Sequence, residues 1–168
     1  MSRKKVIADF RRDERGATAI EFAFVAPVMI FALLSLVEIG VIGMMSTSLD
    51  NAVITTSRML RTGRDDAPSS AEGMEIQICR NMGGDYARCR DRLVVSVQKY
   101  PKFANANAVV AAQPAGEFAR GVPGDIVVVK ANYRWPLMSP FLAQAFERTG
   151  LMEVTLGSRV TFKNEPYA

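Results

Sequence analysis

The stretch FAFVAPVMIFALLSLVEIGV, residues 22–41, decides how this chain is organised, because its only charged residue is Glu38 near the far end. As a helix this stretch rises about 30 Å, roughly the hydrocarbon thickness of a bilayer. The composition therefore predicts a membrane-spanning helix near the start of a chain of 168 residues. The remaining length suits one modest domain.

A cleaved secretory signal is the alternative interpretation, since it also joins a basic start to an apolar run. Such a signal has a shorter apolar region that ends at small residues. The run here continues without a break into a segment that is compatible with a helix. We therefore favour the anchor.

The flanking charges predict the orientation of the span. After the span, Arg58 and Arg61 are the only basic residues within about twenty positions, the range over which such charges act. The positive-inside rule therefore keeps the N-terminus in the cytoplasm and places the rest outside the inner membrane. The basic residues before the span are Arg3, Lys4, Lys5, Arg11, Arg12 and Arg15.

The net charge of +4 comes mostly from this leader. Residues 1–16 hold six basic and three acidic residues, which gives +3 and leaves +1 for the rest of the chain. The basic balance is thus poor support for nucleic-acid binding, and we expect none.

The helix is expected to continue beyond the bilayer as far as residue 63. One apolar stripe runs along this continuation at helical spacing. Gly63 then suits a C-terminal cap, and Pro68 breaks the pattern. The pattern predicts one helix over residues 17–63 with a kink near Pro27. The stripe consists of Met45, Leu49, Ala52, Val53, Thr56 and Leu60.

A short second helix is expected next, before a glycine pair at 83–84. Ser69 and Glu72 have the spacing of a capping box, and Met74 and Ile78 are four residues apart.

Cys79 and Cys89 lie on the proposed outer side, where oxidising conditions would let them pair. By chain entropy such a bridge contributes roughly 3 kcal/mol, less any strain. A metal site is the alternative, but two cysteines in a chain without histidine make an incomplete zinc site. We favour the disulfide over free thiols or a metal, and we expect no cofactor.

Beyond residue 91 the period changes from helix to strand, in three segments that alternate or are rich in β-branched residues. Leu93, Val95 and Val97 share one face of the first. The third alternates Val154, Leu156, Ser158, Val160 and Phe162. The segments are RLVVSVQKY, GDIVVVKANYRW and VTLGSRVTF. The expected fold class is α+β, a long N-terminal helix that continues into a small head with about three antiparallel strands and short helices.

Two connections complete the expected head. Residues 102–121, rich in Ala and Asn, are predicted to be irregular. FLAQAFERT, residues 141–149, is predicted to be a helix capped by Ser139, started by Pro140 and ended by Gly150. On the second strand, Tyr133 and Trp135 share a face and are interpreted as core or sheet-edge residues rather than a ligand platform.

Catalysis has little support in the sequence. Without histidine, Ser-His and Cys-His dyads and His-ligated metals are excluded. GVPGD lacks the lysine and the spacing of a phosphate-binding loop. Asp65 and Asp66 are adjacent in a loop and are interpreted as solvated side chains rather than an acid and base pair. We expect a protein that is not an enzyme.

Gly16, ATAI and Glu21-Phe22, followed by an apolar helix, resemble the processing site of a type IV prepilin. GATAIEFAFVAPVMIFALLSLVEIG resembles, more narrowly, the TadE-like pseudopilins of tight-adherence (Flp) pilus systems. NAVITTSRMLRTG is also similar to that family, and the closing FKNEPY is reminiscent of some members. The likeness covers roughly residues 16–63.

The resemblance implies cleavage after Gly16 by a prepilin peptidase, which would expose an α-amino group on Ala17 with a reference pKa of roughly 8. Glu21 lies four residues on, so its carboxylate can neutralise this terminus or that of a neighbouring subunit. The alternative is that Glu21 simply lies in the headgroup region. The leader carries Asp13 and Glu14 beside the cleavage site, so its local charge is mixed. The alternative to cleavage is a chain that keeps its leader.

Glu38 has two interpretations as well: a carboxylate near the outer interface that reaches water, which we favour, or a buried contact with a partner subunit. Family members often carry an acidic residue here.

The resulting hypothesis divides the chain into a leader (1–16), a transmembrane and emerging helix (17–63) and a periplasmic α+β head (64–168). It is a single-pass inner-membrane subunit for assembly of an adhesion or secretion pilus. Its expected partners are prepilin peptidase, other pilins or pseudopilins and Tad inner-membrane assembly proteins. The alternative function is an unprocessed envelope protein with a periplasmic binding or scaffold domain.

Overall fold

The computed structural model describes residues 16–83, 86–100, 116–139, 142, 148–150 and 152–166. Residues 1–15 of the basic leader and residues 101–115 of the expected irregular connection lie outside the described residues.

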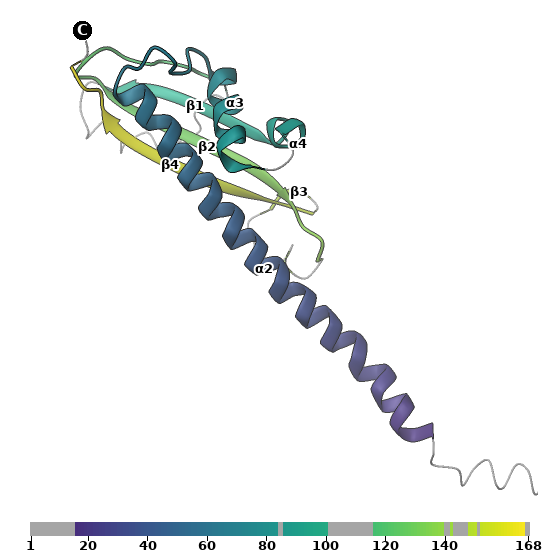
Figure 1. The fold of residues 1–168 in the computed structure, drawn as a ribbon. Helices are drawn as coiled ribbons and strands as arrows, with labels where there is room; N and C mark the ends of the chain where they lie inside the picture. Colours follow the sequence, from purple (N-terminus) through teal and green to yellow (C-terminus); the bar gives the residue numbers. More distant parts are fainter. Residues whose placement is uncertain are drawn as a thin grey trace, which may run out of the picture.

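A helical stalk and a small head make up the described chain (Figure 1). The four strands form an antiparallel sheet in the order β1-β2-β4-β3. The α+β class with a long N-terminal helix is confirmed. The elements are α2 (Ala17–Arg61), α3 (Ala71–Met82), α4 (Tyr86–Arg90), β1 (Leu93–Tyr100), β2 (Ile126–Pro136), β3 (Arg148–Gly150) and β4 (Glu153–Lys163).

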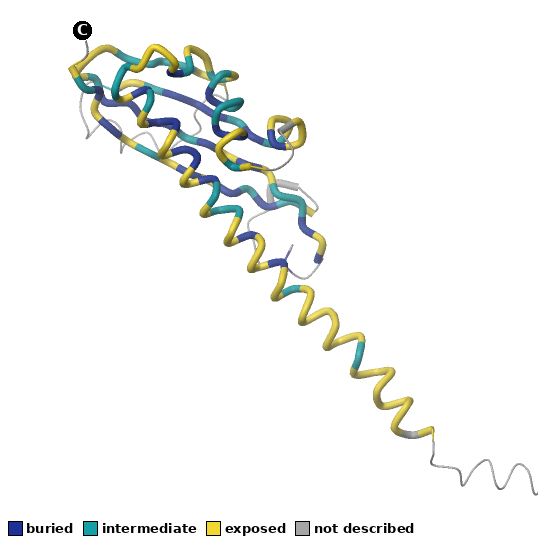
Figure 2. The backbone as a smooth tube through the Cα atoms, viewed as in Figure 1, coloured by how far each residue is buried: buried dark blue, intermediate teal, exposed yellow. Residues whose placement is uncertain are grey.

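The upper part of α2 packs in the head, where it contacts α3, β2 and β4. The stripe expected from helical spacing faces the core: Leu49, Val53 and Leu60 are at most 1% exposed. Figure 2 shows the buried positions gathered in the head and on the upper part of the helix. Because this stripe is covered by protein, the emerging half of α2 is an integral part of the head.

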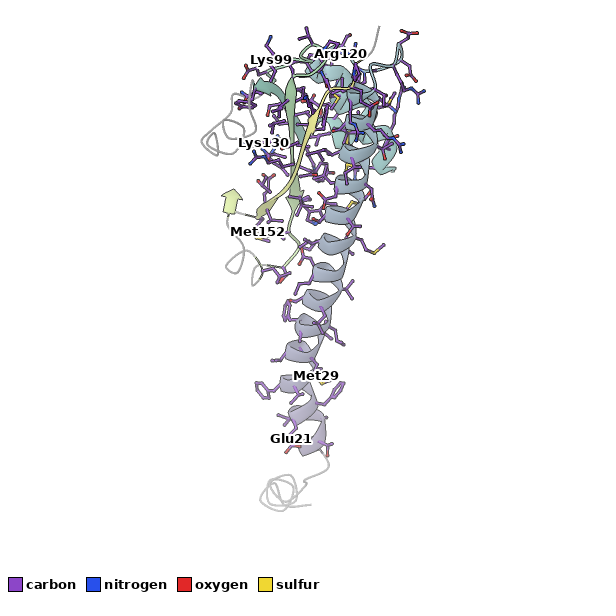
Figure 3. The ribbon with its side chains drawn as sticks, turned by 90° about the vertical axis from the view of Figure 1, so that its left-hand side faces the viewer. Glu21, Met29, Lys99, Arg120, Lys130 and Met152 are labelled. Atoms are coloured by element: carbon purple, nitrogen blue, oxygen red, sulfur yellow. A yellow bond between two sulfur atoms is a disulfide. The ribbon has the colours of Figure 1, made fainter. Side chains whose placement is uncertain are left out.

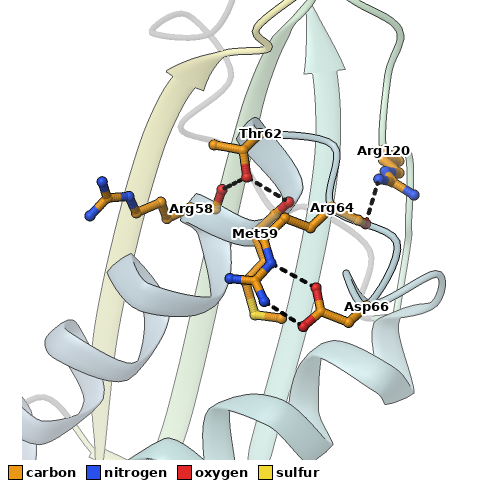
Figure 4. A network of polar contacts seen from close by, with 6 residues as sticks. All are labelled: Arg58, Met59, Thr62, Arg64, Asp66 and Arg120. Carbon is orange, nitrogen blue, oxygen red and sulfur yellow. Dashed lines mark hydrogen bonds and ion pairs between the residues drawn. The ribbon is translucent and has the colours of Figure 1, made fainter. Parts of the chain in front are cut away.

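The end of α2 is closed by local hydrogen bonds (Figure 4). Thr62 donates its hydroxyl to the carbonyl oxygen of Arg58 at 3.0 Å. Gly63 then adopts a φ of 63°, which side chains disfavour, and turns the chain out of the helix. Arg64 and Asp66 form a bidentate ion pair beyond the turn. The helix therefore stops close to the predicted position.

The second helix, α3, begins one residue later than the capping-box spacing predicted. The cap is Ser70, whose hydroxyl accepts a hydrogen bond from the Gly73 amide at 3.0 Å. Ser69 is not the cap, and Glu72 instead pairs with Arg90. The buried pair Met74 and Ile78 is as expected.

The long strands keep the predicted faces. Leu93, Val95 and Val97 of β1 are buried, and so are Val154 and Leu156 of β4. β2 lies between them and is paired along its whole length, Ile126–Pro136, with β4. Its central valines are buried on both faces, which explains the continuous β-branched run.

The helix predicted over residues 141–149 is wrong at its end. Arg148–Gly150 form β3, which pairs with the start of β4. Gly150 is thus a strand residue and does not cap a helix. The reason is local competition, because a β4 edge next to the segment offers its backbone partners. Residues 140, 141 and 143–147 lie outside the described residues.

The C-terminal FKNEPY motif ties three elements together. Asn164 is 3% exposed and donates its side-chain amide to the carbonyl oxygens of Arg120 and Val122, at 3.0 and 3.3 Å. Glu165 donates its amide to the Arg61 carbonyl oxygen at 3.0 Å and receives the Arg61 guanidinium on its carboxylate at 2.6 Å. The motif therefore fixes the top of α2 against the end of the sheet.

Candidate functional site

The lower part of α2 extends away from the head and presents apolar side chains to its surroundings (Figure 3). Leucine, phenylalanine, valine and methionine side chains here are more than half exposed, among them Phe22, Phe24, Val28, Met29 and Leu33. The helix is long and apolar enough to cross a membrane. Such a surface is unstable in water but matches the interior of a bilayer. This helix is therefore the candidate functional element.

Gly16 is the N-cap of α2, and the first helical residue is Ala17. Gly16 has a φ of −91°, and a side chain added there would meet nothing within 4 Å. Glu21 is exposed one turn into the helix, at the end farthest from the head (Figure 3). Gly16, Ala17 and Glu21 thus lie close together at the start of α2, where the cleavage site and the charge pair stay predictions.

The position of Glu38 differs from the one we favoured from the sequence, a carboxylate that reaches water. The residue is only 8% exposed. Its carboxylate accepts hydrogen bonds from the backbone amides of Met138 and of Ser139, the latter at 2.9 Å. Charge-assisted bonds of this kind are about twice as strong as neutral ones. Glu38 therefore fastens the segment after β2 to the middle of α2.

A second contact lies one turn lower on the helix. The hydroxyl groups of Ser35 and Ser139 are 3.2 Å apart and share a hydrogen bond. Glu38 and Ser139 also take part in the lining of a groove of about 440 Å³ between α2 and the end of β2. Phe31, Leu34, Val37, Trp135 and Met138 line it.

Cys79 and Cys89 form a disulfide, which joins α3 to α4. Both are buried, at 2% and 6% exposure. The bridge lies in the head and comes after the stalk in the sequence. It holds two short helices together, which is a structural role. In the part of the chain that the structure describes, no group of three or more acidic or cysteine side chains could hold a metal ion.

The aromatic pair Tyr133 and Trp135 packs against the core, with ring centroids 6.3 Å apart. On the same strand, burial and the neighbouring Arg159 guanidinium lower the pKa of Lys130. Lys130 and Arg159 are directly opposed across β2 and β4, so a like-charge contact adds to the larger effect of burial on this pKa.

Sequence reasoning did not find the contact between Glu38 and the 138–139 segment. The partners are backbone amides one hundred residues away, and an amide has no signature in a sequence. The only signal was a single carboxylate at the end of an apolar run.

Comparison with known proteins identifies the stalk. A family model described as TadE-like protein matches residues 16–58. No curated protein and no solved structure matches the chain. The matched range begins at the N-cap of α2 and ends one turn before the helix does. Residues 16–58 of this chain are therefore similar to the TadE-like family, and the match covers the helix and not the head.

Proposed function

We propose that this chain is a pseudopilin, a minor pilin-like subunit that serves in the assembly of a Tad/Flp-type pilus. In this proposal α2 is inserted in the inner membrane with its N-terminus in the cytoplasm. Prepilin peptidase removes residues 1–16, and the head 64–168 stands in the periplasm. Its partners are other pilins or pseudopilins and the Tad assembly proteins of the inner membrane.

One observation carries the proposal: the TadE-like match and α2 start at the same place. The match begins at Gly16, and the helix begins at Ala17. Cleavage after Gly16 would leave a helix whose first residue bears a free amino group. A positive charge at a helix N-terminus opposes the helix dipole. Glu21, four residues on, supplies the carboxylate that offsets this charge within the subunit or in a neighbour.

The work of the protein is then association, and the hydrolysis at Gly16 is performed by the peptidase. The exposed apolar half of α2 supports this, because such a surface fits lipid before assembly and neighbouring helices after it. The packing of the upper part of α2 in the head supports it further, since a subunit of a filament must carry its head at a fixed angle.

Mass spectrometry of the chain from native membranes tests the processing step. We expect an N-terminus at Ala17, and one at Met1 or Ser2 in cells that lack the prepilin peptidase. An uncut terminus in both strains would contradict the proposal and leave an anchored envelope protein.

Gly16→Leu is the matching variant. A side chain at this position meets no neighbour, so the fold should be unaffected and only cleavage should stop. Gly40→Leu is the control, because Gly40 has equally open surroundings on the same helix and lies away from the site.

Glu21→Gln tests the charge pair separately. In an assembled pilus, where neighbouring helices would surround this end of α2, a charge left without its partner costs about 3 kcal/mol or more, so most pilus assembly should be lost while processing continues. Glu21→Asp keeps the charge and should restore part of the assembly. Normal pilus numbers with Glu21→Gln would remove the pair from the mechanism.

A further inference from the structure

The segment 136–139, which begins at the last residue of β2, has an unusual hydrogen-bond inventory. Pro136 has no amide hydrogen, and Leu137 donates its amide to the Met152 carbonyl oxygen at 2.8 Å. Met138 and Ser139 donate theirs to Glu38. Every backbone donor of this irregular segment is therefore absent or bonded inside the protein.

Two side chains of the segment are also bonded or buried, and a third is exposed to the surroundings. The Ser139 hydroxyl bonds with that of Ser35, and Leu137 is 6% exposed. Met138, by contrast, is 89% exposed, although it is a large apolar residue. A segment whose backbone donors are absent or bonded inside the protein, and which displays an apolar side chain, is adapted to a surrounding without water.

The position of the segment along α2 agrees with this. From Ala17 to Glu38 the helix rises about 32 Å at roughly 1.5 Å per residue, which is close to the hydrocarbon thickness of a bilayer. Ser35 lies about 5 Å farther toward the N-terminal end than Glu38 on the same scale. If residues 17–38 cross the membrane, residues 138–139 lie at the boundary between headgroups and acyl chains of the outer leaflet.

The groove between α2 and the end of β2 lies at the same level. Its lining is mostly apolar, although it includes Glu38 and Ser139. Phe31 and Leu34 of the groove also belong to the exposed lower surface of α2. Trp135 is part of the groove, and tryptophan is enriched at this depth of membranes.

We propose that an acyl chain of an outer-leaflet phospholipid occupies this groove and that the Met138 side chain inserts among the neighbouring lipids. The head then rests on the bilayer. Glu38 makes this contact possible because it satisfies the two amides that would otherwise meet lipid unpaired. The inference rests on the membrane insertion that is part of the proposed function.

Trp135 is the only tryptophan of the chain and therefore reports on its own groove. The full chain is reconstituted, at a low ratio of protein to lipid, into phosphatidylcholine vesicles whose acyl chains carry bromine near the headgroup or near the methyl end. Bromine near the headgroup should remove about half of the Trp135 emission, as expected for a tryptophan at the interface, and bromine near the methyl end should remove less.

Two variants serve as controls, both with Trp135→Phe. Phe24→Trp places the reporter on the exposed lower part of α2, where bromine should quench it strongly. Val122→Trp places it on an exposed residue near Asn164, at the opposite end of the sheet, where no quenching is expected. Met138→Asp, at an exposed position, should lift the segment and reduce quenching of Trp135.

Quenching at Phe24→Trp without quenching of Trp135 would overturn the inference. The groove would then be filled by water or by a second copy of the chain instead of lipid. Equal quenching of Trp135 and Val122→Trp would overturn it too. Absence of quenching at Phe24→Trp would overturn the membrane insertion itself, and the inference with it.

Discussion

Leu33 and Leu49 belong to the same helix, yet Leu33 is 58% exposed and Leu49 is 1% exposed. The two halves of α2 thus face different surroundings. Residues 22–41 are apolar all round, whereas the upper half has one apolar stripe and polar residues elsewhere. Apolar surface on every side fits lipid, and a stripe fits a protein core. The number and the spacing of the apolar residues together therefore assign each half of α2 to its surroundings.

The largest difference between the halves should come from truncating these leucines. Leu49→Ala should lower the free energy of unfolding of the head by about 2–5 kcal/mol, because it leaves a cavity in the core. Leu33→Ala should change it by less than about 0.5 kcal/mol, since the residue is outside the head. Urea unfolding of the full chain in mild detergent, followed by Trp135 emission, measures both. Similar losses for the two variants would contradict the division.

The disulfide between α3 and α4 should stabilise the head, in which the upper half of α2 is packed, and should leave the exposed lower half of α2 unaffected. Cys79→Ala with Cys89→Ala should cost the head about 2–3 kcal/mol, because the unfolded chain loses a closed loop. Reduction of the unaltered chain with dithiothreitol is the matched control and should give a similar loss. Phe24→Trp quenching by brominated lipid should stay the same. A reduced chain as stable as the oxidised one would show that the bridge is dispensable.

Glu38 lies where the two halves meet, so its replacement should loosen the junction. Glu38→Ala leaves two amides without an acceptor and should cost about 1–3 kcal/mol. Glu38→Gln keeps one acceptor oxygen and should cost less. Glu21→Gln, at the exposed end of the helix, is the control and should leave the stability of the head unchanged. The same urea titration decides, and equal stability of Glu38→Ala and the unaltered chain would refute the role of this contact.

The smallest effect is expected at the top of α2. Arg61 and Glu165 form an ion pair whose side chains are 51% and 45% exposed, so Arg61→Ala should cost at most about 1 kcal/mol. High salt should reduce this difference further. A double-mutant cycle with Glu165→Ala isolates the pair, and a coupling as large as the loss with Glu38→Ala would contradict the contrast between exposed and buried carboxylates.

Local pattern was sufficient for most of the elements. The helical stripe of α2, the alternation of β1 and β4 and the glycine at position 63 each act within a few residues, and each was predicted. Errors arose where two local solutions were nearly equal. Ser69 and Ser70 are both good caps, and the structure uses Ser70. Residues 148–150 suited a helix end, but a neighbouring strand edge provided partners.

The candidate site divides in the same way. Gly16, Ala17 and Glu21 stay predictions: a resemblance to prepilins singled out the first two, and the four-residue spacing puts Ala17 and Glu21 on one helix face. The fate of Glu38 was not predictable, because its partners are the amides of Met138 and Ser139. Any non-proline residue offers such an amide, so nothing in the sequence distinguishes these two.

By itself, the sequence determined the elements, the apolar span and the cysteines near enough to pair, because these depend on residues close together in the chain. Only the tertiary structure decided where the head attaches to the helix. It brought residues 135–139 beside residues 31–41 and buried Glu38 there. The physical reason is that long-range contacts depend on the folded path of the backbone, whose donors and acceptors are the same at almost every residue.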